Sequence, residues 1–97
     1  MSIARIGNFT GKPGQIDELK DFLFSIIPMI KSSPGCESVQ LFQSQEDPAS
    51  FTMIEIWDRI ESHQASVKNI PAEKLAGIRP LLGPNPHGSY YELVSAQ

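Results

Sequence analysis

Hydrophobic and polar residues alternate with a period of two in four segments of this chain, a pattern typical of half-buried β-strands. These segments span residues 3–10, 36–44, 50–58 and 89–95. A short polar stretch that contains a proline, residues 45–49, separates the second segment from the third. We therefore predict that the two middle strands form a β-hairpin.

Apolar residues spaced three and four positions apart mark the helical segments. The clearest spans residues 15–31, and a shorter helix is predicted from the capping-box spacing of Asp58 and Glu61 to about Lys68. Another helical stretch opens at Ile70, with Pro71 in its first turn. The order strand, helix, strand, strand, helical segment, strand predicts a ferredoxin-like β-α-β-β-α-β fold of the α+β class. We expect one domain over residues 1–97, an antiparallel sheet with helices on one face.

The strand at residues 50–58 carries two different sets of side chains. The set expected to face the helices is Thr52, Ile54 and Ile56. The set expected to point away from them is Phe51, Met53, Glu55 and Trp57. Large apolar residues on an open sheet face would form a patch that monomers avoid, so we expect a homodimer in which a second sheet covers them. These residues then either fill the interface or enclose a small ligand.

Composition narrows the classes of function. The chain has 97 residues, of which 40% are hydrophobic and 20% charged, with a net charge of −3 and a pI of about 5.2. This acidic balance is unlike that of nucleic-acid-binding proteins and disfavours anionic membranes. Cys36 is the single cysteine, which excludes an intrachain disulfide. The N-terminal residues lack the layout of a signal peptide and no apolar run is long enough to cross a membrane, so we expect a cytoplasmic protein.

The run from Ile54 to Ser66 holds a Glu-x-Trp strand end followed by a short helix with a histidine, His63. Together with the segments at residues 34–37 and 88–93, it resembles the antibiotic biosynthesis monooxygenase family, over nearly the whole chain. The resemblance implies a dimeric α+β barrel. Some members oxidise phenolic or anthrone-like polyketides with O2 and use neither metal nor flavin, whereas related members oxidise quinols, turn over signal molecules or degrade haem.

Cofactor-free oxygenation needs an electron-rich, easily deprotonated substrate in a site that excludes water. For that chemistry the candidate catalytic residues are His63, Trp57 and Asn8, with His63 as proton acceptor. The candidate substrate-binding residues are Phe51, Met53, Glu55, Tyr90 and Arg79. Structural roles are open for each: exposure for His63, packing for Trp57 and the tyrosines, a helix-end position for Arg79, and a salt bridge to Arg5 for Glu55.

Three hypotheses follow. The first is a cofactor-independent monooxygenase that acts on a small aromatic, quinol-like or polyketide-type substrate. The second is a non-catalytic, small-ligand-binding or stress-related dimeric barrel, favoured because no second histidine follows His63 within its helix. The third is a haem-degrading monooxygenase. Haem-degrading relatives use an asparagine and a tryptophan, and Asn8 and Trp57 loosely resemble this pair. The chain has no Gly-rich phosphate loop, Cys-x-x-Cys or His-x-x-x-His motif, so we expect no metal and no cofactor.

Overall fold

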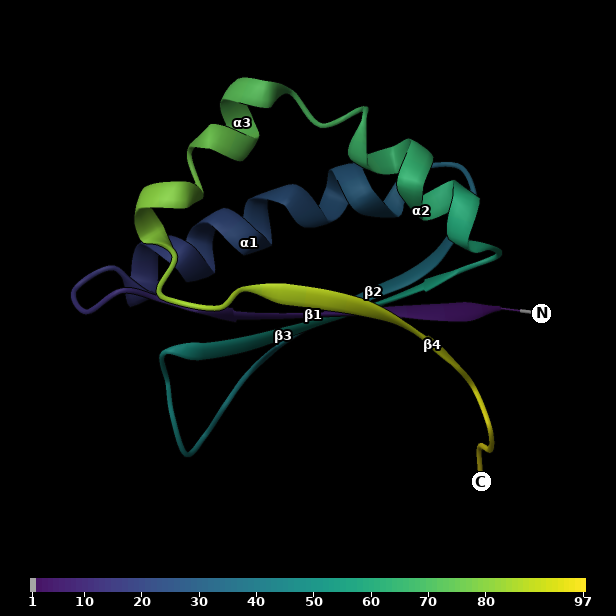
Figure 1. Ribbon diagram of the computed structural model, residues 1–97, viewed down its shortest axis with the longest axis horizontal. Helices are drawn as coiled ribbons and strands as arrows, with labels where there is room; N and C mark the ends of the chain where they lie inside the picture. The colour runs from purple at the N-terminus through teal and green to yellow at the C-terminus, as the bar shows by residue number, and fades with distance from the viewer. Residues whose placement is uncertain (1) are drawn as a thin grey trace.

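The computed structural model describes residues 2–97 (Figure 1). Its elements follow one another in this order: β1 (Ile3–Thr10), α1 (Ile16–Lys31), β2 (Cys36–Gln43), β3 (Ser50–Trp57), α2 (Ile60–Val67), α3 (Ala72–Ala76), the 3₁₀ turn η1 (Arg79–Leu81) and β4 (His87–Glu92). The strands form one antiparallel sheet in the order β2-β3-β1-β4. The helices all lie on one side of this sheet (Figure 1). The predicted ferredoxin-like α+β fold is confirmed.

The ends of several elements differ from the predicted ends, for reasons visible in the pairing. β4 ends at Glu92 because Glu92 pairs with Ile3, the first residue of β1, so the apolar residues beyond it have no strand to pair with. The prediction of a capping box is wrong: Arg59 is the N-cap of α2, and no side chain within residues 2–97 forms a capping hydrogen bond with that helix. The backbone N–H of Asp58 instead bonds the carbonyl of Gly35, 2.9 Å away. No helix within residues 2–97 is both long and apolar enough to span a membrane.

The hydrophobic core lies between α1 and the sheet. From α1 it receives Leu19, Leu23, Ile26 and Ile30, and from β3 it receives Phe51, Met53 and Trp57. The prediction that Phe51, Met53, Glu55 and Trp57 point away from the helices is therefore wrong. A period of two separates a strand into two sets but does not say which set is inside. Here the bulkier set packs against the helix, where it buries the most apolar surface.

The opposite, outer face of the sheet carries a second group of apolar residues. Ile6 and Ile54 face each other across β1 and β3, and Ile56 lies next along β3. Phe42 and Tyr91 extend this face onto both edge strands and are each 48% exposed. This chain alone leaves the face uncovered.

Candidate functional site

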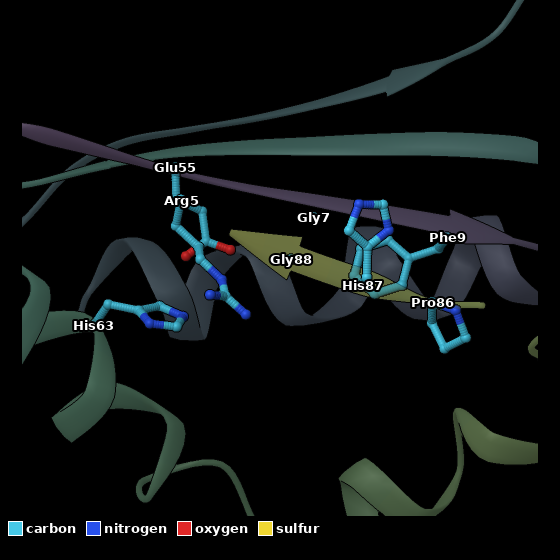
Figure 2. A pocket seen from close by; sticks show the side chains of 8 residues that line it. All are labelled: Arg5, Gly7, Phe9, Glu55, His63, Pro86, His87 and Gly88. Carbon is cyan, nitrogen blue, oxygen red and sulfur yellow. The ribbon is translucent and has the colours of Figure 1, made fainter. Parts of the chain in front are cut away.

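A cavity of about 410 Å³ opens on the helix side of the sheet, over β1 and β4 (Figure 2). The residues that line it are Arg5, Gly7, Phe9, Glu55, His63, Pro86, His87 and Gly88. His63 reaches into it from α2, Pro86 comes from the loop before β4, and the other lining residues belong to β1, β3 and β4. This volume falls in the range of small-molecule sites in proteins.

Two glycines explain why the sheet is hollow at this point. Gly7 and Gly88 are direct partners on β1 and β4, so two neighbouring positions on the helix side carry no side chain. A Cβ atom at Gly88 would lie only 2.6 Å from Arg5 Nη2. Glycine at position 88 therefore lets the Arg5 side chain lie across the backbone of β4.

Three rings pack edge to face at one end of the cavity, and of the three His63 is the one that lines it. His63 Nδ1 lies 2.6 Å from the Tyr90 hydroxyl, within hydrogen-bond distance. The imidazole also packs against Trp57 at a ring-centroid distance of 5.5 Å and against Tyr90 at 5.4 Å. The histidine is therefore held by its neighbours on β3 and β4 rather than free in solvent. The structure brings together three of the predicted residues, His63, Trp57 and Tyr90.

Glu55 is a buried carboxyl group, with 9% of its surface exposed. Trp57 donates its indole N–H to Glu55 Oε1 over 2.9 Å. Burial raises the pKa of Glu55, and this is only partly offset by the hydrogen bond from Trp57 and by the positive charge of Arg5. The expected salt bridge between Glu55 and Arg5 is not formed within 4.0 Å. In the part of the chain described, the one side-chain ion pair joins Arg59 and Asp58.

Arg5 is a site residue that sequence reasoning considered only as a salt-bridge partner. It is half-buried, and its guanidinium lies 4.8 Å from the centre of the Tyr90 ring, in a cation–π contact. Within residues 2–97 no hydrogen-bond acceptor or carboxylate pairs with it. A cation held in place but left without an anion is suited to bind a negatively charged ligand oxygen.

Burial and the nearby Arg5 both lower the pKa of His63, with burial the larger cause. At neutral pH the imidazole is therefore uncharged and able to accept a proton.

We predict that His63 titrates below the ordinary histidine value of 6.5. In a His87→Gln variant His63 is the remaining histidine, so its ring signals can be followed by NMR as the pH is lowered. Because the unfolded chain takes up this proton first, the free energy of unfolding should decline as the pH falls from 6.5 toward the folded-state value. A midpoint at or above 6.5 would contradict the assigned environment.

The remaining predicted residues lie elsewhere. Asn8 is on the outer face, where its Oδ1 accepts a hydrogen bond from Thr52 over 3.0 Å, so it is not inward and does not approach His63. Arg79 is exposed at the start of η1 and does not line the cavity. Phe51 and Met53 are core residues beneath α1. Asn8 and Trp57, the pair reminiscent of haem degraders, lie on opposite faces of the sheet.

Two signals could have pointed to the missed residues. Arg5 lies directly opposite Glu55, and Gly7 directly opposite Gly88, once the strands are paired.

His87, expected in a loop, is exposed at the first position of β4 and lines the cavity. In residues 2–97 no group of three or more His, Cys, Asp or Glu side chains is arranged to hold a metal ion.

Comparison with solved structures supports the fold over the full chain. Rv0793 from Mycobacterium tuberculosis matches with a TM-score of 0.85 at 17% identity, covering 99% of this chain and 98% of that one. The NE2512 protein from Nitrosomonas europaea matches at 0.82 and 26% identity, covering 99% and 92%. A candidate antibiotic biosynthesis monooxygenase from Chloroflexus aurantiacus J-10-fl matches at 0.76 and 30% identity, covering 100% and 98%. No curated protein matches.

A likeness at 17% identity shows the fold alone, so the family rests on two other findings. The Chloroflexus protein is 30% identical over the whole of this chain. The model of the antibiotic biosynthesis monooxygenase family matches residues 2–74, well over half of the sequence. On these grounds the chain belongs to the antibiotic biosynthesis monooxygenase family.

Proposed function

We propose that this protein is a cofactor-independent monooxygenase that oxidises a small aromatic, quinol-like or polyketide-type compound with O2. Family membership supports a monooxygenase-like role in general. The observation that carries the finer proposal is the His63–Tyr90 pair, which stands beside the unpaired Arg5 at the cavity. Together these residues offer a proton acceptor and a fixed positive charge.

Oxygenation without a cofactor needs both the proton acceptor and the positive charge. A phenol or enol becomes electron-rich enough to reduce O2 once its hydroxyl proton is removed. One oxygen atom then enters the product and the other leaves as water, with all electrons supplied by the substrate. A cation beside the substrate oxygen stabilises the anion and so favours its formation.

Each residue has a defined part in this scheme. When Nδ1 of His63 carries the proton, it donates to the Tyr90 hydroxyl, which leaves Nε2 free to accept the substrate proton. Arg5 receives the resulting oxyanion. Trp57, buried beside His63, holds the imidazole from its other side.

The test is oxygen uptake by the protein in the presence of a chelator, with a panel of naphthols, anthrones and quinols. We expect substrate-dependent uptake that a His63→Ala variant largely lacks. Equal uptake by the two proteins would refute the proposal for these substrates. Tight binding without uptake would instead identify the non-catalytic, ligand-binding barrel.

A homodimer is part of the proposal, and its interface is the outer face of the sheet. The support is the uncovered apolar surface around Ile54 and Ile56, since monomers rarely leave such patches open. We also place the protein in the cytoplasm, in keeping with its single cysteine.

We predict that Ile54→Asp weakens the dimer by about 100-fold, because an unpaired charge buried in an interface costs roughly 3 kcal/mol. Light scattering over a dilution series measures the effect. Phe24→Asp is the matched control, since Phe24 is 72% exposed on α1 and should leave the dimer unchanged. A dimer insensitive to Ile54→Asp would place the interface elsewhere.

A further inference from the structure

The cavity wall carries two opposite charges side by side. Arg5 and Glu55 are direct partners on β1 and β3, so their side chains leave the sheet on the same side. Both line the cavity, and Figure 2 shows both pointing into it. Because they do not form an ion pair within 4.0 Å, each keeps hydrogen-bonding capacity for a ligand.

That capacity can be assigned atom by atom. Of the two Glu55 oxygens, Oε1 accepts from Trp57, and Oε2 has no donor within residues 2–97. The guanidinium nitrogens of Arg5 likewise have no acceptor in this part of the chain. In the described residues no fully buried side-chain nitrogen or oxygen atom lacks a partner. The unpartnered atoms of Arg5 and Glu55 are therefore open to a molecule in the cavity.

The wall beside Glu55 includes two planar groups, the Phe9 ring and the Arg5 guanidinium. Gly7 and Gly88 are the next pair on the helix side of β1 and β4, after Arg5 and Tyr90. Without side chains they leave room for these groups, because a Cβ atom at Gly7 would lie 3.1 Å from the Phe9 ring and one at Gly88 would lie 2.6 Å from the Arg5 guanidinium. A planar ring can stack against such planar groups, and a volume of about 410 Å³ admits two or three fused rings.

We propose that the cavity selects planar compounds carrying two oxygens on adjacent carbons, one as an anion or carbonyl bound by Arg5 and one as a hydroxyl that donates to Glu55. The class comprises catechol-like diols and ortho-hydroxy ketones. An isolated phenol satisfies Arg5 but covers Glu55 Oε2 without donating a hydrogen bond to it, so that oxygen loses its access to water and gains no partner. This inference rests on the proposed function, since it names the substrate class of the same site.

The experiment compares three ligands of nearly equal size: 2,3-dihydroxynaphthalene, 2,7-dihydroxynaphthalene and 2-naphthol. Binding to the full chain is measured by calorimetry without oxygen, so that no turnover occurs. We expect the adjacent diol to bind about tenfold more tightly than the other two. Equal affinities, or no binding of any of them below about 1 mM, would overturn the proposal.

Two variants assign the selectivity to its residues. Glu55→Gln keeps an oxygen for the Trp57 N–H and should reduce the preference for the adjacent diol to about twofold or less. Arg5→Gln should weaken all three ligands by about tenfold. Glu46→Gln in the hairpin loop and Arg59→Gln, which is exposed, are matched controls and should change neither quantity. A preference that survives Glu55→Gln would overturn the assignment.

The ratio of affinities within one variant does not depend on how much of that variant is folded. The outcomes also separate this inference from the proposed function. Selective binding without oxygen uptake would refute the monooxygenase and leave the selectivity in place. Oxygen uptake with equal affinities for the three ligands would refute the selectivity and leave the monooxygenase in place.

Discussion

Trp57→Ala should lower the free energy of unfolding by about 3–5 kcal/mol, the largest stability effect expected of a single substitution in this chain. Trp57 has no exposed surface and lies in the core with Leu19, Leu23 and Phe51. Its removal leaves a cavity and also takes the hydrogen-bond donor away from the buried Glu55. Small domains have a total stability of about 5–15 kcal/mol, so the variant should be close to unfolding.

Urea titration at one fixed protein concentration measures this loss, since dimerisation would make stability depend on concentration. Trp57→Phe keeps most of the packing but not the N–H, and should cost less than the alanine variant. Phe24→Ala, at a position 72% exposed, should change stability by less than about 0.5 kcal/mol. A loss below about 1 kcal/mol for Trp57→Ala would contradict the buried environment described for the indole.

His63→Ala should lower the turnover rate by about 10²–10⁴-fold, the usual contribution of a positioned general base. The physical reason is that, among the described residues that line the cavity, His63 is the base held in place by a side-chain hydrogen bond, and its lowered pKa leaves it uncharged at pH 7. Steady-state oxygen uptake at saturating substrate measures the change. Binding should persist, because Arg5, Glu55 and Phe9 remain in the cavity wall.

Two further variants distinguish a base from a packing residue. Tyr90→Phe retains the ring against His63 but removes its hydroxyl, so the rate should fall by about tenfold and the acid limb of the pH profile should move. Gln64→Ala replaces the exposed residue next to His63 on α2 and should leave the rate unchanged. If His63→Ala retained the full rate, a group other than His63 would have to accept the substrate proton.

The order of the elements could be predicted from the sequence because local patterning determines it. The alternation of residues 3–10 gave the bounds of β1 correctly. Which face of β3 lies inside could not be read in the same way, because both sets of residues contain large apolar side chains. The choice depends on packing against α1, where Phe51, Met53 and Trp57 meet Leu19 and Leu23. The same error assigned these residues to the interface instead of the core.

The candidate site could be predicted only in part, for a related reason. His63, Trp57 and Tyr90 were named because aromatic and imidazole groups are recognisable by type, and they meet in the structure. The hollow beside them is made by Gly7 and Gly88, two residues with no side chain. Such a feature emerges only when two strands pair in a particular register. Asn8 was predicted to belong to the site, but it follows Gly7 in β1, so its side chain points to the outer face of the sheet.

In the proposed function, this cavity transfers one oxygen atom from O2 to its substrate. The most direct test is turnover of 1-naphthol or an anthrone under ¹⁸O2 in the presence of a chelator, with mass spectrometry of the product. We expect one ¹⁸O atom in the product formed by the wild-type protein and a loss of that product with His63→Ala. Product without ¹⁸O, or labelled product at equal rates from both proteins, would contradict it.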